Sequence, residues 1–411
     1  MHISNNIQTD FFKPVAAAYA AGGELSNEAL YAQLEASTCL PASIWDERAA
    51  VDASGQLYSL AKRKVRWIQQ TLRELCAIEH VPGKRGVWRA VARGDDELTK
   101  AQPGVALVAF STDLGLALWS DAKSVFSKIT EPIHLILTSP PYPLQKARAY
   151  GGPTEKQFVD FVCTELEPLV RNLVPGGSLC LNISNDIFLQ GSPARSLYLE
   201  RTVLAIHDRL GLFLQDRLIW ENPTKPPGPT MWACKTRQQL SHTWEPILWF
   251  TNDPSNCFAD NRRVLRQHSD RQTKLIAAGG EQRSAVYGDG AYTLKPGSFG
   301  HATIGSIPRN ILRYAQSSRE VQETRATALA NGLPTHGATM PVKLAKFLIE
   351  FLTPPNSLVA DPFGGWCTTG LAAQEAGRRW IVTERIAQYV AGASWRFRHA
   401  PGHQASFDLS R

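Results

Sequence analysis

Residues 357–384 read SLVADPFGGWCTTGLAAQEAGRRWIVTE, and their pattern gives the clearest indication of the fold class. The pattern predicts a strand, a tight turn with Gly364 and Gly365, a helix, and a second strand that ends at Glu384. Small residues in such a turn let a ligand approach the backbone, and the helix N-terminus behind it is electropositive. A carboxylate at the end of the second strand can accept both hydroxyls of a ribose. The stretch therefore predicts a nucleotide-binding unit of an α/β protein.

A second pattern, HLILTSPPYPL at residues 134–144, places a buried strand directly before Ser139, Pro140, Pro141 and Tyr142. Open α/β sheets bind ligands at the carboxyl ends of their strands, so this loop is placed for chemistry. The prolines stiffen the backbone and cannot donate amide hydrogens, which leaves carbonyl oxygens as acceptors. Taken alone, the tetrapeptide favours an ordinary proline turn, and only its pairing with the donor stretch reverses this preference.

The loop suits a reaction at an amino group that is conjugated to an aromatic ring. Such an amine is a weak nucleophile, because its lone pair is delocalised into the ring. We expect the Ser139 hydroxyl oxygen and the Pro140 carbonyl to accept the two amino hydrogens, while Tyr142 stacks on a flipped base. No covalent intermediate is needed for this chemistry.

Both stretches resemble motifs of DNA amino-methyltransferases: SPPY resembles motif IV and DPFGGWCTT resembles motif I. The segment HGATMPVKLAKFLIEFLTPP resembles motif X, a helix beneath the methionine end of the donor. The resemblance covers about residues 105–395 and has the β-type order, with the catalytic loop first and the donor segment last. It implies a Rossmann-like S-adenosylmethionine methyltransferase sheet with circularly permuted motifs. It also implies a set of donor-binding residues, namely Asp361, Phe363, Gly364, Gly365, Thr368, Glu384, His336, Thr339 and Pro341.

The first residue of the catalytic loop, Ser139, indicates which base amino group receives the methyl group in the resembled family. Within the resembled family, Ser139 is typical of enzymes that methylate cytosine N4, whereas adenine N6 enzymes usually begin the loop with Asp or Asn. Methylation of cytosine carbon requires a nucleophilic cysteine, usually after proline, and none of the seven cysteines follows a proline. Adenine methylation remains the alternative within the same enzyme class.

Two positions of motif I depart from the family pattern. Trp366 and Cys367 occupy places that are usually small or polar. We favour an indole that packs against neighbouring protein, although an indole there could also narrow the donor pocket. The departure motivates a different function, a catalytically inactive DNA-binding protein that keeps a methyltransferase fold.

Size and composition limit the class of protein. The 411 residues can bury a large core, and the net charge of +7 is compatible with a polyanionic partner. The cysteines are scattered without a C-x-x-C pair, so we expect neither a disulfide framework nor a metal site. The N-terminal stretch has neither a secretory pattern nor an apolar run of membrane length. We therefore expect a cytoplasmic protein without a membrane partner.

Shifts in periodicity divide the chain into five ranges. Residues 105–251 carry the catalytic loop, and residues 336–411 carry the donor segment; their strand and helix patterns alternate, as in a parallel sheet. Residues 252–335 are polar, with 11 basic against 7 acidic residues, and by resemblance form a target-recognition region. Residues 93–104 are expected to be a linker.

Residues 1–92 are expected to form a separate DNA-binding domain. Two helical patterns are followed by a turn and a short strand, and Val65, Ile68, Leu72 and Leu75 have core spacing. Residues 61–93 hold 9 basic against 2 acidic residues. The whole resembles the winged-helix N-terminal domain of Mrr-type restriction proteins.

Together these patterns predict a site-specific methyltransferase that uses S-adenosylmethionine, requires no metal and methylates cytosine N4 in double-stranded DNA. A role in restriction-modification beside a cognate endonuclease fits this chemistry, as an inference from context alone. Methylation of a protein or a small molecule is disfavoured by the two basic regions.

Overall fold

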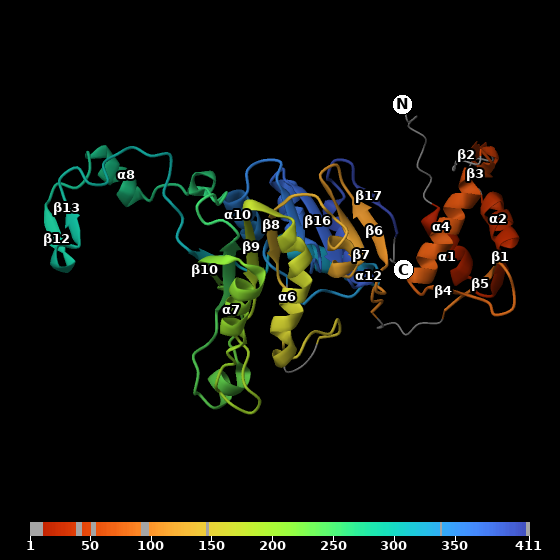
Figure 1. Cartoon of the computed structure of the whole chain (residues 1–411), viewed down its shortest axis with the longest axis horizontal. Helices are drawn as coiled ribbons and strands as arrows, with labels where there is room; N and C mark the ends of the chain where they lie inside the picture. The colour runs from red at the N-terminus through yellow and green to blue at the C-terminus, as the bar shows by residue number, and fades with distance from the viewer. Residues whose placement is uncertain are drawn as a thin grey trace.

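The computed structural model describes residues 11–37, 43–50, 55–91, 98–144, 148–337 and 339–407. A large α/β body occupies the centre, a small α/β domain lies at one end, and an arm projects from the other end (Figure 1). The central body holds both motifs that the sequence singled out.

The core of the body is a sheet of ten strands in the order β14-β10-β11-β9-β8-β15-β16-β7-β6-β17. The strands span Ile311–Arg313 (β14), Phe213–Glu221 (β10), Trp244–Thr251 (β11), Leu173–Asn182 (β9), Ile133–Thr138 (β8), Leu358–Asp361 (β15), Arg379–Glu384 (β16), Gly115–Ser120 (β7), Ala106–Ser111 (β6) and Gln404–Ala405 (β17). Strands from the two ends of the chain thus alternate within one sheet, as the permuted motif order implies.

The sheet is mixed, which corrects the expectation of a parallel sheet. The five central strands β9, β8, β15, β16 and β7 run parallel. Strand β11 is antiparallel to both β9 and β10, and β6 is antiparallel to β7 and β17. The connections from β6 to β7 and from β10 to β11 contain no α-helix, and hairpin-like connections of this kind favour antiparallel pairing.

Helices cover both faces of the sheet. On one face, the apolar sides of α5 (Ala122–Phe126), α6 (Glu155–Arg171) and α7 (Tyr198–Leu210) pack against the sheet. The other face is covered by α10 (Val342–Leu352), α11 (Thr368–Glu375) and α12 (Ala387–Ser394). Because both faces are buried, central strands such as β15 are apolar along nearly their whole length.

The N-terminal domain joins helices to a small antiparallel sheet of order β1-β5-β4. Its elements are α1 (Phe12–Ala20), β1 (Glu24–Ser26), α2 (Asn27–Ala36), α3 (Ser43–Asp46), β2 (Arg48–Ala50), β3 (Leu57–Ser59), α4 (Leu60–Glu74), β4 (Ile78–His80) and β5 (Val87–Ala90). The four residues with core spacing are all buried, as expected, and the basic side chains of α4 are exposed. The winged-helix assignment itself stays a prediction. Phe12 meets Phe407 of the body, with ring centroids 6.3 Å apart.

Part of the predicted linker, residues 93–104, packs against the body. Residues 93–97 lie outside the described residues, but the following residues pack onto the donor half of the body. Lys100 forms a β-bridge with Ile386, and the backbone amide of Thr99 donates to Gln388 over 2.9 Å. Residues 98–104 therefore belong to the body.

The structure divides the range 252–335. Helix α8 (Asp270–Ala277) and the hairpin of β12 (Ala285–Tyr287) and β13 (Tyr292–Leu294) form the projecting arm (Figure 1). Strand β14 instead pairs with β10, and α9 (Arg319–Ala330) contacts α12. Only the middle of the predicted recognition region stands away from the body.

Four short helical turns complete the described elements, namely η1 (Thr230–Lys235), η2 (Asn261–Val264), η3 (Gly288–Gly290) and η4 (Trp395–Phe397).

The sequence led us to expect neither a disulfide framework nor a membrane span. Six cysteines are described, all of them free thiols. No described helix has both the length and the apolar character that a membrane span needs.

Candidate active site

A cavity of about 660 Å³ opens between the two stretches that the sequence singled out. It lies at the carboxyl ends of β8, β15 and β16, which are neighbours in the sheet. Twelve of the thirteen predicted site residues line it, namely Ser139, Pro140, Pro141, Tyr142, His336, Thr339, Asp361, Phe363, Gly364, Gly365, Thr368 and Glu384. Pro341 is not among the lining residues; it is the N-cap residue of α10.

The carboxylate of Asp361 links the two halves of the site. Its Oδ1 accepts hydrogen bonds from the Thr138 hydroxyl over 2.6 Å and from the backbone amide of Phe363 over 3.0 Å. Burial raises the pKa of Asp361, and these hydrogen bonds oppose the rise. The same carboxylate thus shapes the turn after β15 and ties it to the end of β8.

Glu384, at the end of β16, is a half-buried carboxylate on the cavity wall. One oxygen accepts the amide of Gly365 over 2.7 Å, and the other accepts the amide of Ile386 over 2.7 Å. Burial raises the pKa of Glu384 to about 7 despite these two hydrogen bonds. Each oxygen has a further lone pair, so the carboxylate can still accept ligand hydroxyls.

The two glycines of the turn are required for different reasons. A side chain at Gly364 would place its Cβ 2.1 Å from Cγ1 of Val382, so close packing against β16 alone demands glycine there. Gly365 has a φ of +52°, and a Cβ would come 3.0 Å from the His336 ring. Close packing against β16 therefore accounts for the glycine at position 364. At Gly365 an added side chain would come close to His336, which lines the cavity.

An aromatic group forms one side of the cavity, and sequence reasoning found only part of it. The ring of His336 stacks on Tyr150 at 5.8 Å and meets Tyr389 edge-on at 4.9 Å. Trp366 lies 6.3 Å from His336 and is only 2% exposed, packed among Leu333, Ile386 and Tyr389. The indole thus packs against protein, and Trp366 is also one of the residues that line the cavity. Tyr150 and Tyr389 carried no motif signal, because they follow the catalytic loop and the donor segment at unremarkable positions.

The catalytic loop is held by the hydroxyl of Tyr142. This oxygen lies 2.9 Å from Ser139 Oγ, and the hydroxyl donates towards Asn182 Oδ1 at 3.2 Å and Glu245 Oε2 at 3.3 Å. Burial, with Glu245 as the next contributor, holds the pKa of Tyr142 well above its usual value. Tyr142 therefore remains a neutral hydroxyl that can donate one hydrogen and accept others.

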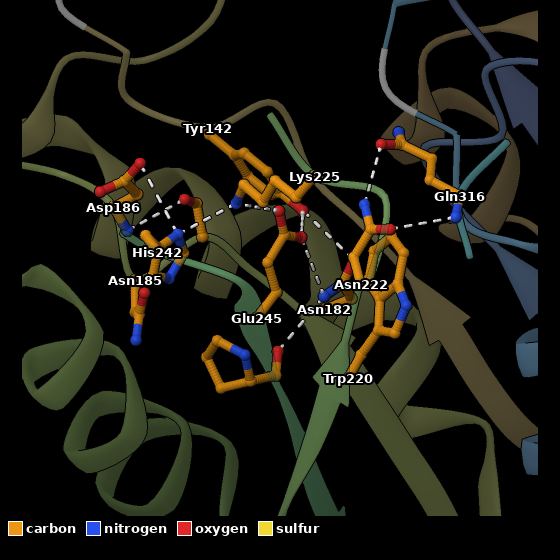
Figure 2. A network of polar contacts seen from close by, with 12 residues as sticks. Tyr142, Asn182, Asn185, Asp186, Trp220, Asn222, Lys225, His242, Glu245 and Gln316 are labelled. Carbon is orange, nitrogen blue, oxygen red and sulfur yellow. Dashed lines mark hydrogen bonds and ion pairs between the residues drawn. The ribbon is translucent and has the colours of Figure 1, made fainter. Parts of the chain in front are cut away.

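Further polar side chains form a connected network with Tyr142 (Figure 2). Lys225 Nζ lies 3.4 Å from Glu245 Oε1 and 3.0 Å from His242 Nδ1. Burial and, next, Lys225 lower the pKa of His242 to about 4, so this ring is neutral near pH 7 and accepts from Lys225. Sequence reasoning missed Glu245 and Lys225, because their positions along the chain gave no sign that they reach the catalytic loop.

The described residues include no cluster of three or more His, Cys, Asp or Glu side chains that could hold a metal ion. The fit of a nucleoside-containing donor rests on other features. Glu384 offers a carboxylate to hydroxyls, the backbone at Gly365 leaves room beside His336, and aromatic rings supply apolar surface. These groups suit S-adenosylmethionine.

The mixed ten-strand sheet, with the Gly-rich turn and the catalytic loop on one cavity, defines a Rossmann-like methyltransferase fold. The sequence model of the DNA methylase family, whose members are N6 and N4 methyltransferases, matches residues 133–394. The chain belongs to this family. The N-terminal domain and the first two strands of the body lie outside the match.

Individual relatives agree with this membership. The type II methyltransferase M.PvuII of Proteus hauseri is 33% identical over 304 residues, which cover 70% of this chain and 85% of that protein. The DNA adenine methyltransferase YhdJ of Escherichia coli is 22% identical over 287 residues, or 68% of this chain and 82% of that protein. The solved structure of the cytosine-N4-specific PvuII DNA methyltransferase superposes with a TM-score of 0.56 at 28% identity, covering 71% of this chain and 88% of that one.

Proposed function

We propose that this DNA methyltransferase transfers a methyl group from S-adenosylmethionine to the N4 amino group of cytosine in double-stranded DNA. The observation that carries the proposal is the shared cavity: Ser139 and Tyr142 of the catalytic loop and Phe363 and Glu384 of the donor segment all line it. The donor supplies an electrophilic methyl group. The chain positions the amine that receives it, so catalysis rests on placement and hydrogen bonding.

Three groups on the donor side of the cavity hold S-adenosylmethionine or support the turn that binds it. Glu384 holds the ribose hydroxyls, the backbone at Gly365 lets the ligand lie close to the turn, and Asp361 keeps the turn in place through Thr138 and Phe363. Thr339 and His336, at the entry to α10, line the side of the cavity assigned to the methionine end.

The acceptor side holds the amine. The Ser139 hydroxyl and the Pro140 carbonyl accept the amino hydrogens, and the Tyr142 ring stacks on the flipped base. Two facts favour cytosine over adenine: the catalytic loop begins with serine, and a relative named as cytosine-N4-specific superposes on the body. Adenine N6 is the second candidate, because YhdJ, named as an adenine methyltransferase, matches a similar share of the chain.

Duplex DNA would be held at two regions beyond the cavity. The projecting arm carries basic side chains and lies at one end of the molecule, and the basic helix α4 lies at the other (Figure 1). We assign the arm to recognition of the target site and the N-terminal domain to added affinity for phosphates. A partner endonuclease, as in restriction-modification, accords with relatives named type II methyltransferases.

The acceptor is tested by expressing the protein in a host that lacks DNA methylation and analysing the nucleosides of its DNA. N4-methylcytosine is the expected product, and N6-methyladenine alone would overturn the acceptor assignment. Calorimetry addresses the inactive alternative: purified protein that binds neither S-adenosylmethionine nor its demethylated product would be a DNA-binding protein without this activity.

A further inference from the structure

Methylation of an amine leaves a nitrogen with a positive charge and one hydrogen too many. The methyl carbon bonds to nitrogen while its bond to the sulfonium sulfur breaks, and the cationic product must then lose a proton. The groups proposed to hold the amine are the Ser139 hydroxyl and a backbone carbonyl, and neither can keep an additional proton near neutral pH. The site therefore needs a proton acceptor further away.

We propose that Glu245 is this acceptor, reached from the amine through the hydroxyls of Ser139 and Tyr142. The inference rests on the function proposed above and adds a positioning residue to the same site. Ser139 Oγ lies 2.9 Å from Tyr142 Oη, and Tyr142 Oη lies 3.3 Å from Glu245 Oε2. Figure 2 shows Glu245 and Tyr142 pointing toward one another from β11 and the catalytic loop.

The proton moves in three transfers that balance. The cationic amine gives a proton to Ser139 Oγ, the original hydroxyl hydrogen of Ser139 passes to Tyr142 Oη, and the original hydrogen of Tyr142 passes to Glu245 Oε2. Both hydroxyls are restored, and Glu245 becomes a carboxylic acid. The high pKa of Tyr142 is compatible with this scheme, because a hydroxyl relays a proton without being ionised at rest.

Asn182 is the competing acceptor for the Tyr142 hydrogen. Its Oδ1 lies 3.2 Å from the same hydroxyl, and its Nδ2 lies 3.5 Å from Glu245 Oε2. A carboxamide oxygen accepts a hydrogen bond but does not take up a proton near pH 7. Of these two neighbours, only Glu245 can end the relay.

Lys225 completes the arrangement. Its ammonium lies 3.4 Å from Glu245 Oε1, so the two side chains form an ion pair beside the end of the relay. The side chains of Lys225 and Glu245 are 22% and 18% exposed, so water can remove the proton after turnover. The titratable groups that face or surround Glu245 are Tyr142, Tyr198, Lys225, His242 and Asp186.

The substitution Glu245→Gln tests the relay, because the amide keeps the shape and an acceptor oxygen but cannot take up the proton. At saturating donor and DNA, we expect kcat to fall by about 100-fold, the lower end for loss of acid–base catalysis, with both KM values retained. We expect wild-type kcat to fall as the pH is lowered, because the relay must end on an unprotonated carboxylate. This fall should be absent in the variant. A role in structure alone would leave that pH profile in place.

Two comparisons sharpen the test. Glu221→Gln is the matched control, since Glu221 ends the neighbouring strand β10 and pairs with Arg313 at 3.5 Å, away from Tyr142; its kcat should equal that of the wild type. Tyr142→Phe breaks the same chain while keeping the ring. Tyr142→Phe with Glu245→Gln should therefore be no slower than the slower single variant.

Wild-type kcat in Glu245→Gln, or losses that simply add in the double variant, would overturn the relay. Either result would leave DNA methylation by the wild type intact. Failure of the wild type to methylate DNA, by contrast, would overturn the proposed function and the relay with it.

Discussion

The hydroxyl of Thr138 donates a hydrogen bond of 2.6 Å to Oδ1 of Asp361, across 223 positions of sequence. The bond joins the last residue of β8 to the last residue of β15 at the place where these parallel strands open onto the cavity. It connects the catalytic loop, which starts at Ser139, with the donor turn. Both sides of the reaction therefore depend on one buried contact.

Thr138→Val should lower stability by about 1–3 kcal/mol, because the buried carboxylate of Asp361 loses a partner. Donor binding should weaken as well, since the turn after β15 loses support. Thermal unfolding and calorimetric titration measure the two effects. Ser357→Ala is the matched control: its buried hydroxyl has no partner among the described residues, and its removal should cost less. Equal losses in both variants would contradict the assigned role.

Donor affinity should depend on pH through Glu384. The ionised carboxylate is the form that accepts two hydroxyls, and burial raises its pKa to about 7. Affinity should therefore fall as the pH drops below about 7, and this dependence should vanish in Glu384→Gln. Titration calorimetry at several pH values between 6 and 8 measures it. An unchanged pH dependence in the variant would assign the titration to another group.

The same carboxylate predicts the sign of a stability change. Glu384 has a higher pKa when folded, about 7, than the ordinary value of 4.5, so between these values the folded state binds more protons than the unfolded one. Its contribution to stability is thus fully present at low pH and is lost as the pH rises through about 7. Comparing urea unfolding of the wild type and Glu384→Gln without donor isolates this contribution from other carboxylates.

Catalysis and donor binding should separate by mutation. Ser139→Ala and Tyr142→Ala should depress turnover and leave donor affinity largely intact, because these side chains hold the acceptor. Asp361→Ala and Glu384→Ala should weaken donor binding first. Methylation assays at saturating donor, paired with calorimetry, distinguish the classes. The opposite pattern would discredit the assigned roles.

The basic face of α4 should contribute to DNA affinity. Arg63 and Arg73 are exposed on this helix, so Arg63→Gln with Arg73→Gln should weaken binding and reduce the slope of log affinity against log salt by about 2. Lys128→Gln with Arg171→Gln removes two exposed charges beside α5 and α6 as a control. Fluorescence anisotropy over a salt series measures the slopes. Equal changes in both variants would indicate a general charge effect.

Three features could be predicted from the amino-acid sequence alone, namely the strand-turn-helix unit at Asp361, the catalytic loop at Ser139 and the core face of α4. These features are local, because hydrophobic period and turn residues depend on neighbours within a few positions. Twelve of the thirteen predicted site residues accordingly line the cavity. Pro341 fell outside it, since a proline at a helix start is compatible with either role.

The folded structure was needed to show which strands are neighbours and which distant side chains are in contact. The antiparallel flanks of the sheet, the packing of residues 98–104 on the body, and the contact of Glu245 with Tyr142 all join distant parts of the chain. Distant strands pair because the whole chain must bury both faces of the sheet. The local sequence of one strand does not indicate which other strand will lie beside it. Glu245 reaches the hydroxyl of Tyr142 because β11 pairs with β9 in the folded sheet.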